Sequence, residues 1–569
     1  MSSASVKDNI VGSPQSSCGE ARFRIAVIGC GPKGLFCLER LLERLTSVEN
    51  RRGLEIVIFE QAPYPGAGQV YDLRQPDYLR MNFASHNISA WPPNGHLNSF
   101  PQPTLVDWLQ QYFPHMAKPD AFIPRALVGE YLHWCFQEVF KQLKRLAAVR
   151  IERASVSQIT REGQSWRVDS PHDSTVYDEV LLTVGHEGWR TSLPQKLAGH
   201  PADVNSVFPT EKQLSVDHVR PQSTVVIRGF GLTAIDAILA MTEGRGGHLK
   251  RRDGKWFYTP SGQEPSTIIP CSRSGRPMFA KPVPGKALVP EKVKNIWPRY
   301  REVLLQLPAQ TDGLDFERDM WPVIQDAAKY AFNLCGGRGA RQWFDSWYMV
   351  DCDGQTAAEL MQQSYRVAMG QQNPSAAWAW GEAWRQLYPA LVARISHGGL
   401  KDNSWADFHP LAAEMERLAF GPPAENLGRL LALIEHQIVD LRFVSGCYPG
   451  TESRSIETES GTTQLAVDHF VNAVLPAPSE LAPEGLLAAL VQDRLVSRHE
   501  PSQALLVNRE ARPLDSAGHP TAGLALFGRC TEGCILGNDT LSRTMHDHPE
   551  TWANSVCRHL LCSKGKTHE

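Results

Sequence analysis

The chain has 569 residues, too many for one ordinary hydrophobic core, and its length predicts about three domain-sized units. Its content of 42% hydrophobic and 21% charged residues is typical of a soluble globular protein, and no apolar run reaches the roughly 20 residues of a membrane span. The net charge of −3 gives no reason to expect nucleic acid or an anionic membrane as a partner.

The N-terminal residues and the cysteines carry no sign of export or of disulfide chemistry. Residues 1–21 are polar, rich in serine and lack the apolar core of a secretory signal, so we expect a disordered leader and a cytoplasmic protein. The 12 cysteines include no Cys-x-x-Cys pair, and the closest two are Cys530 and Cys534. A redox pair or a metal site there is one interpretation, but isolated thiols in a reducing cytosol, with no metal, are favoured.

The most informative motif follows an apolar run at Ile25–Ile28, which predicts a buried strand. Gly29, Gly31 and Gly34 come next in G-x-G-x-x-G spacing, and helical periodicity extends from Leu35 to Leu45. This order of strand, glycine turn and helix is the context that a dinucleotide-binding site requires. The glycines permit the tight turn, the approach of a pyrophosphate and close helix packing, while the helix N-terminus faces the phosphates.

A second strand is predicted at Glu55–Phe59, and Glu60 follows it directly. In dinucleotide sites an acid about 20 residues after the glycines binds a ribose hydroxyl. Two prolines and two glycines then fix a loop at residues 61–71, which could run back along a bound flavin nucleotide. These features favour a dinucleotide site over a glycine-rich turn in an unrelated α/β domain.

Three polar residues beyond this loop each have more than one interpretation. Asn82 and Ser85 stand among apolar residues, where they could hydrogen-bond the edge of a flavin ring or cap the local loop. Arg125 precedes an amphipathic helix predicted to end near Leu146. It could pair with a phosphate or a substrate carboxylate, or lie at the surface.

A β-meander and a crossing strand are predicted next. Val149–Val168 alternates in polarity and carries turn signals, and the run from Tyr177 to His186 contains an apolar strand that delivers Gly185 to a sharp bend. Such a strand could carry the chain from the first dinucleotide unit into a second one.

The opening pattern is repeated after residue 223. Thr224–Arg228 is a mostly apolar strand, and Gly229 and Gly231 follow it, with Ala234 in the third position, where the motif tolerates alanine. A plain β-turn-α unit is the alternative, but a second copy of the pattern makes a second dinucleotide site the favoured interpretation.

Basic residues follow the next predicted strand, Thr267–Cys271, at the position where an NAD enzyme would have an acid. Ser272 begins this turn, and Arg273 and Arg276 lie in it. Two arginines favour a nucleotide that carries a 2′-phosphate, hence NADPH over NADH. A solvated basic turn is the alternative.

Helical periodicity dominates from residue 288 to residue 441, and eight of the 15 tryptophans fall between Trp297 and Trp405. The clearest predicted helix is Asn426–Leu441. We interpret the block as a helical insertion, which either caps an active site and excludes water or is a well-packed accessory domain.

The remaining sequence predicts a return to the first unit. A second meander is expected at Leu441–Pro476, with a strand in Gln464–Leu475 that could carry the chain back, and a helix at Leu486–Leu495. A last strand, a glycine loop and a helix start follow Gly523. Asp539 could be the N-cap of that helix or touch the ribityl or pyrophosphate region of a flavin nucleotide.

The predicted fold class is α/β, with two Rossmann-like, three-layer ββα dinucleotide-binding domains and a helical insertion. The expected domains are the leader at 1–21, a discontinuous FAD-binding domain at 22–190 and 442–569, an NADPH-binding domain at 191–287 and the insertion at 288–441.

Together, these motifs resemble the FAD/NAD(P)-binding family of two-dinucleotide flavoproteins, and the resemblance runs from about Phe23 to Trp552. The better understood members are similar to flavin-dependent N-monooxygenases, including aspartate N-monooxygenases that form nitrosuccinate. Two departures stand out: Val184 replaces a threonine found in many relatives, and Ala234 replaces a glycine.

The resemblance implies FAD at the first site and NADPH at the second, and it gives no catalytic side chain. The expected FAD-binding residues are Gly29, Gly31, Pro32, Lys33, Gly34, Glu60, Gln61, Gly68, Gln69, Asn82, Ser85, Gly185, Asp539 and Thr540. The expected NADPH-binding residues are Gly229, Gly231, Leu232, Thr233, Ser272, Arg273 and Arg276, and Arg125 is a candidate for the substrate.

Two dinucleotide sites in one chain imply hydride transfer from NADPH to FAD. Without a Cys-x-x-Cys pair, molecular oxygen is the expected electron acceptor, and a flavin C4a-hydroperoxide would oxidise the nitrogen of an amino acid or small amine, such as L-aspartate. The alternatives are oxygenation of carbon or sulfur, of the Baeyer–Villiger or sulfide type, and a flavin-binding redox sensor without turnover.

Overall fold

A five-stranded parallel sheet joins the first and the last strands of the chain. The computed structural model describes residues 22–565 except 50, 52, 94–96, 98–99, 188, 190–201, 309–312, 446–454, 458–463, 478–479 and 539–540, so the predicted leader lies outside the described residues. The sheet has the order β15-β7-β1-β2-β3, and every neighbouring pair is parallel. Its strands are β1 (Phe23–Ile28), β2 (Leu54–Phe59), β3 (Ala148–Glu152), β7 (Glu179–Leu182) and β15 (Leu524–Leu526).

Alternating residues of these strands face two different layers. Ile25 and Val27 pack on a helical layer, while Ala26 and Ile28 pack on a layer that includes the antiparallel sheet β4-β5-β6. The helical layer contains α1 (Pro32–Thr46), α2 (Leu105–Tyr112), α3 (Arg125–Leu143) and α15 (His548–Gly565). The opposite layer contains β4 (Gln158–Glu162), β5 (Ser165–Ser170), β6 (Asp173–Tyr177) and α14 (Leu486–Gln492). The predicted three-layer ββα arrangement is therefore confirmed for this sheet.

The meander differs from its prediction at one end. It begins at Gln158 rather than Val149, because β3 pairs in parallel with β2 and so belongs to the main sheet. The expected helix through Leu146 ends at Leu143, and the three-residue helix η1 (Ser85–Asn87) lies between β2 and α2.

A second parallel sheet has the order β11-β8-β14. β8 (Thr224–Arg228) and β11 (Thr267–Cys271) match their predicted ranges, and β14 is His469–Asn472. The other elements that accompany this sheet are α4 (Thr210–Gln213), α5 (Leu232–Met241), β9 (His248–Arg252), β10 (Lys255–Thr259) and α13 (Ala424–Glu435).

β14 is the element that pairs differently from expectation. Its sequence resembles the crossing strand β7, and it was expected to return the chain to the first sheet. Instead, His469–Asn472 pairs in parallel with Val225–Arg228, and the side chain of Arg228 donates a hydrogen bond to Asn472 Oδ1 over 2.9 Å. This part of the 442–569 segment therefore lies in the second sheet, and the other predicted domain limits stay predictions.

The predicted insertion is helical. Its helices are α6 (Glu291–Lys294), α7 (Trp297–Leu305), the π-helix η4 (Phe316–Met320), α8 (Trp321–Leu334), α9 (Ala340–Met349), α10 (Gly354–Ala368), α11 (Ala376–Ile395) and α12 (Trp405–Ala419). Trp380, Trp384 and Trp405 are among its fully buried side chains. The helix expected at 426–441 ends at Glu435, because Gln437 adopts a left-handed φ of 62° and the Ile438 N–H bonds to the Leu433 carbonyl.

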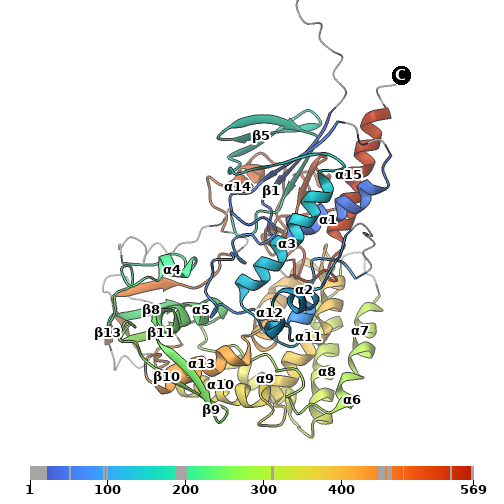
Figure 1. Cartoon of the computed structure of the whole chain (residues 1–569). Helices are drawn as coiled ribbons and strands as arrows, with labels where there is room; N and C mark the ends of the chain where they lie inside the picture. The colour runs from blue at the N-terminus through green and yellow to red at the C-terminus, as the bar shows by residue number, and fades with distance from the viewer. Residues whose placement is uncertain are drawn as a thin grey trace, which may run out of the picture.

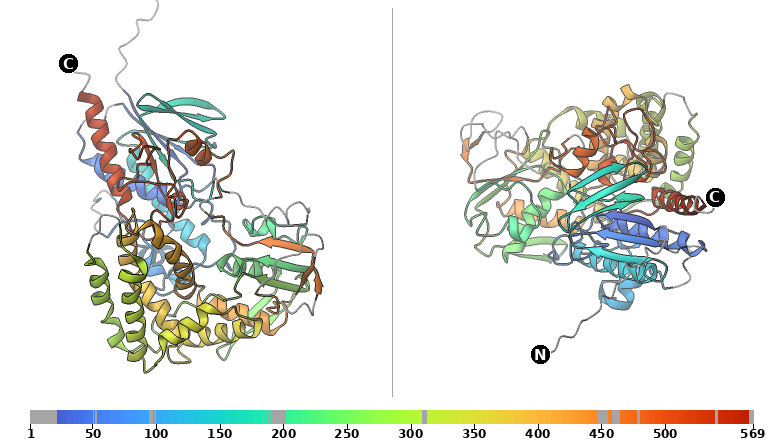
Figure 2. Two further views of the ribbon diagram at one scale, coloured as in Figure 1. Left: turned by 180° about the vertical axis from the view of Figure 1, so that it is seen from behind. Right: turned by 90° about the horizontal axis from the view of Figure 1, so that it is seen from above.

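The three parts are arranged around a common junction. Figure 1 shows the first sheet with α1, α3 and α15 in the upper half, the second sheet on one lower side and helices α6–α8 on the other. The reversed view in Figure 2 agrees, and helices α9, α10 and α13 run between the second sheet and the helical block. The insertion thus reaches from the second sheet to a position below the first one.

The described residues contain no helix that is long and apolar enough to cross a membrane. Apart from Cys271, their cysteines are free thiols, and burial raises the pKa of Cys530 to about 12. Cys534 is also buried and free, so within the described chain these two residues do not form a disulfide.

Candidate functional site

The first glycine turn is closed against the end of β7. Gly29 has a φ of 78°, and a Cβ there would lie 2.7 Å from the Thr183 carbonyl oxygen. The Thr183 hydroxyl donates a hydrogen bond to the Gly29 carbonyl, and a Cβ on Gly34 would lie 3.0 Å from that hydroxyl oxygen. The turn therefore requires glycine at position 29 for both conformation and space, and Thr183 is a supporting residue that the sequence motif did not single out.

The turn leaves bare backbone where a pyrophosphate would approach. Gly31 is the N-cap of α1 and Pro32 its first residue, and a Cβ on Gly68 would lie 3.0 Å from Gly31 Cα. The loop at 61–71 thus lies over the turn, and the Gly66 N–H donates to the Cys30 carbonyl over 2.6 Å. Helix first-turn N–H groups have no acceptor within their own helix, and Lys33 adds a positive charge in that turn of α1. This arrangement fits a dinucleotide phosphate.

Glu60 is fixed at the end of β2 by two backbone N–H groups. Its carboxylate accepts hydrogen bonds from Cys30 N over 2.7 Å and from Ala62 N over 2.8 Å. This places an acid beside the glycine turn, and ribose binding by Glu60 stays a prediction. Gln61 is exposed next to it.

Gln69 lies near the bend that was expected at Gly185. Its side-chain amide donates to Glu187 over 3.0 Å, and burial together with the charge of Glu60 raises the pKa of Glu187. Gly185 has a φ of 60° and is exposed, with open space where a Cβ would lie. The sharp bend is confirmed, and contact of these residues with a flavin stays a prediction.

The two candidates for the flavin ring edge are held by protein groups. Ser85 is buried, and both its N–H and its hydroxyl donate to the Ala121 carbonyl over 3.0 Å. Asn82 Nδ2 donates to the Phe420 carbonyl over 3.2 Å. Ser85 thus caps the local loop and Asn82 links the first unit to the insertion, while contact of either side chain with a flavin stays a prediction.

The C-terminal candidates cannot be placed, because Asp539 and Thr540 lie outside the described residues. The residues just before them are fixed: Glu532 accepts hydrogen bonds from the N–H groups of Gly537 and Asn538 over 2.9 and 2.8 Å. The next helix starts at His548, so the helix start expected near residue 540 is wrong.

The second glycine turn repeats the geometry of the first. Gly229 has a φ of 118°, and a Cβ there would lie 3.2 Å from the Ala473 carbonyl oxygen. Gly231 is the N-cap of α5, which begins with Leu232 and Thr233. This strand, turn and helix match the prediction in position, and their contact with a nicotinamide nucleotide stays a prediction.

The basic turn after β11 separates its two arginines. Arg273 is exposed, and the described residues give it no ion pair. Arg276 is buried: it pairs with Glu414 over 3.2 Å and donates to the carbonyls of Trp347, Tyr348 and Val350. Its donors thus face the insertion, and binding of a 2′-phosphate by Arg276 stays a prediction. Ser272 accepts a hydrogen bond from Gly275 N over 3.1 Å and shapes the turn.

Arg125 pairs with an acid of the second unit. Its guanidinium lies 2.7 Å from Asp236 Oδ2 on α5, and it contacts the Phe208 ring at 5.9 Å. Burial raises the pKa of Asp236, and the charge of Arg125 opposes that shift. Arg125 therefore joins α3 to α5, and its role toward a substrate stays a prediction.

The comparisons with known proteins agree with this geometry. Residues 26–187 match the family model described as FAD-NAD(P)-binding. The chain is similar to an L-aspartate N-monooxygenase (nitrosuccinate-forming) of Streptomyces davaonensis, with 26% identity over 504 residues that cover 73% of this chain and 76% of that protein. It is also similar to the nitrosuccinic acid synthase npaA of Aspergillus oryzae, with 23% identity over 90% of this chain and 85% of that protein.

Among solved structures, the reduced form of ornithine hydroxylase from Pseudomonas aeruginosa overlaps with a TM-score of 0.49 and 12% identity, covering 95% of this chain and 100% of that chain. The range that matches the family model contains the first glycine turn and the strands β2, β3 and β7 of the first sheet. Residues 26–187 therefore match the FAD-NAD(P)-binding family model, and the chain as a whole is similar to the two relatives named above.

Proposed function

We propose that the chain is an FAD- and NADPH-dependent monooxygenase that oxidises the nitrogen of an amino acid, with L-aspartate as the first candidate substrate. One observation carries the proposal: two glycine turns, each between a parallel strand and a helix, occur in a chain that is similar to an L-aspartate N-monooxygenase and to a nitrosuccinic acid synthase over most of the length of each. We also propose a cytoplasmic location, because nine free cysteines among the described residues suit a reducing compartment.

The first unit would hold FAD. The bare backbone at Gly31 and Gly68, the N-terminus of α1 and the anchored carboxylate of Glu60 are placed for the pyrophosphate and a ribose. When bound, FAD supplies hydride acceptance and the activation of oxygen.

The second unit would hold NADPH. Gly229 and Gly231 leave the same bare turn, and Arg273 is the exposed cation at the end of β11 that could face a 2′-phosphate. Glu60 follows β2 in the first unit and Arg273 follows β11 in the second, so the charge at the strand end would favour FAD at the first site and NADPH at the second.

The insertion would exclude water from the space between the units. Its Tyr388 packs against Phe420 with ring centres 5.1 Å apart, and a Cβ on Gly537 would lie 3.1 Å from the Tyr388 ring. The C-terminal glycine loop, the insertion and the 82–85 loop are thus in continuous contact through Phe420 and Asn82. A dry site strengthens electrostatic contacts with a substrate and protects reactive species from water.

The test is NADPH consumption by the FAD-loaded protein in air across a panel of amino acids, with assays for hydroxylamine, nitrite and peroxide. We expect one amino acid, L-aspartate first, to stimulate NADPH consumption and to yield oxidised nitrogen. Stimulation by no amine, with peroxide as the sole product, would contradict the proposal. Oxygen transfer to a ketone or sulfide in the same assay would instead favour carbon or sulfur oxygenation.

A further inference from the structure

A lysine without an acidic partner lies where the three parts of the molecule meet. Lys281 is on the segment that leaves the second unit and enters the insertion. Its ammonium lies 5.7 Å from the centre of the Phe83 ring and 5.6 Å from the centre of the Phe420 ring. Phe83 belongs to the 82–85 loop of the first unit, and Phe420 follows α12.

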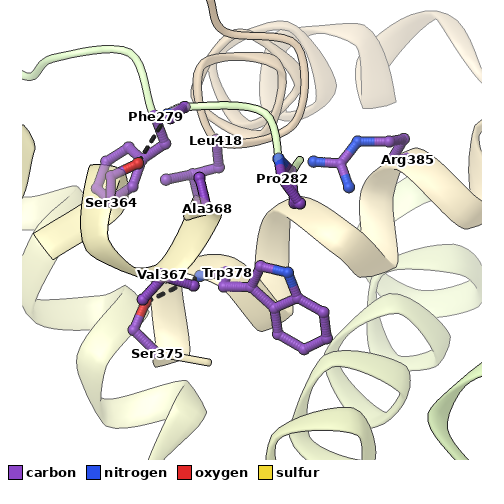
Figure 3. A pocket seen from close by; sticks show the side chains of 10 residues that line it. Phe279, Pro282, Ser364, Val367, Ala368, Ser375, Trp378, Arg385 and Leu418 are labelled. Carbon is purple, nitrogen blue, oxygen red and sulfur yellow. Dashed lines mark hydrogen bonds between the residues drawn. The ribbon is translucent and has the colours of Figure 1, made fainter. Parts of the chain in front are cut away.

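The backbone around Lys281 is fixed by the insertion. The N–H groups of Phe279, Lys281 and Val283 donate to the carbonyls of Arg417, Pro422 and Ala368 over 3.1, 2.9 and 3.0 Å. Figure 3 shows this segment between Ser364 on one side and Arg385 on the other, with Leu418 beside it. Alternate N–H groups therefore hold the backbone of this segment in place, and the Lys281 side chain extends from it to the two rings.

The charge of Lys281 is uncompensated. In the part of the chain that the structure describes, no carboxylate forms an ion pair with it, and its aromatic neighbours contribute only ring faces. Burial and the nearby cation Arg385 lower its pKa to about 7. Arg385 itself pairs with Glu382 and donates to the Ala419 carbonyl. A half-buried ammonium beside a second cation has the electrostatics of a binding position for an anion.

We propose that Lys281 binds a carboxylate of the amine substrate and so acts as a specificity-determining residue. The inference rests on the proposed function, which supplies an amino acid as the substrate. The position suits that role because Phe420 touches both Lys281 and Tyr388, and Tyr388 borders the C-terminal glycine loop at Gly537. A carboxylate held here would lie at the junction of the flavin unit, the nicotinamide unit and the insertion.

A phosphate of NADPH is the other anion that Lys281 could bind. The experiment must therefore distinguish binding of a substrate carboxylate from binding of an NADPH phosphate. Succinate is a suitable probe, because it carries two carboxylates and no nitrogen to oxidise. Its dissociation constant is measured by calorimetry on the FAD-loaded full-length protein, for the wild type and for Lys281→Met. Lys286→Met is the matched control, because Lys286 is an exposed lysine on the same segment.

We expect Lys281→Met to weaken succinate binding roughly ten- to hundredfold, the range for loss of one charge-assisted hydrogen bond. FAD content and the KM for NADPH should stay unchanged, and Lys286→Met should behave as the wild type. In turnover, Lys281→Met should raise the KM for L-aspartate and reduce the preference for L-aspartate over L-asparagine or β-alanine, each of which lacks one carboxylate.

Equal succinate affinities of the wild type and Lys281→Met would overturn the inference, as would a wild type that binds no succinate. A raised KM for NADPH with unchanged succinate binding would assign the ammonium to the nucleotide instead. If Lys281→Met does not retain FAD, Lys281→Arg keeps the charge and should bind succinate within roughly threefold of the wild type, and a larger loss would count against the inference. The proposed function fails on a different result, the absence of amine-stimulated NADPH consumption by the wild type.

Discussion

The two glycine turns of this protein share their local geometry and differ in what surrounds them. In the first unit, Gly29 abuts Thr183 of the neighbouring strand segment, and Glu60 is bonded to the turn. In the second unit, Gly229 abuts Ala473, and the strand end carries Ser272 and Arg273 in place of an acid. A short sequence motif thus specifies the turn, whereas residues distant in sequence, Thr183 and Ala473, decide how tightly it is closed.

A substitution in the first glycine turn, the tighter of the two, should have the largest effect on cofactor binding and stability. Gly29→Ala would place a Cβ 2.7 Å from the Thr183 carbonyl oxygen at a φ of 78°, so we expect a colourless protein without FAD and a loss of stability of more than about 2 kcal/mol. Absorbance and thermal unfolding measure both effects. Gly163→Ala is the control, because Gly163 has a φ of 61° and open space around it, and it should cost only about 1 kcal/mol.

Substitution of the buried arginine of the second unit should have the next largest effect, a loss of stability. Arg276→Met should destabilise the protein by about 3 kcal/mol in denaturant unfolding, because it removes two of the three hydrogen bonds to the buried carboxylate of Glu414 and leaves the one from Arg417. The double variant Arg276→Met/Glu414→Met should recover a large part of that loss. An Arg276→Met protein of unchanged stability but weakened NADPH binding would restore the phosphate interpretation of Arg276.

Arg273→Met is expected to separate nucleotide choice from stability. Loss of one cation facing a 2′-phosphate should lower the preference for NADPH over NADH by roughly tenfold or more, measured as the ratio of kcat/KM values. The exposed position predicts unchanged thermal unfolding. An unchanged cofactor preference would place the 2′-phosphate elsewhere.

The affinity for succinate at Lys281 should depend on pH, and this effect should be smaller than those of the substitutions above. The pKa of Lys281 is lowered from 10.5 to about 7, so the side chain is a cation below pH 7 and loses its charge as pH rises above it. Succinate stays doubly ionised above pH 6.5, so its dissociation constant should increase between pH 7 and pH 9, by at most about tenfold per pH unit. Lys281→Arg should remove this dependence, because arginine stays charged throughout.

The sequence predicted the elements whose signals are local. The strands at 25–28, 55–59, 224–228 and 267–271 and both glycine turns follow from apolar runs and glycine spacing, and the structure contains them. The pairing of β14 could not be predicted, because its apolar pattern suits either sheet and the choice depends on contacts such as Arg228 with Asn472.

The direction in which a side chain points was the second feature that could not be predicted from the sequence. Arg273 and Arg276 are three residues apart in one turn, yet one is exposed and the other is buried against Glu414, which is 138 residues away in sequence. Lys281 belongs to no recognisable motif. The sequence marks it only as a lysine among apolar residues and prolines. Such residues are identified by the partners that surround them, which only the folded chain brings together.

The strand order has a consequence for how the protein can be made. β8 is flanked by β14, and β7 is flanked by β15, so each sheet obtains one of its strands from the last fifth or so of the chain. A fragment that stops after the helical insertion would leave β7 and β8 as open edges, which invite pairing with other chains. During synthesis both edges would have to stay unpaired until residues 469–526 emerge, so neither nucleotide site can be completed before the C-terminal strands arrive.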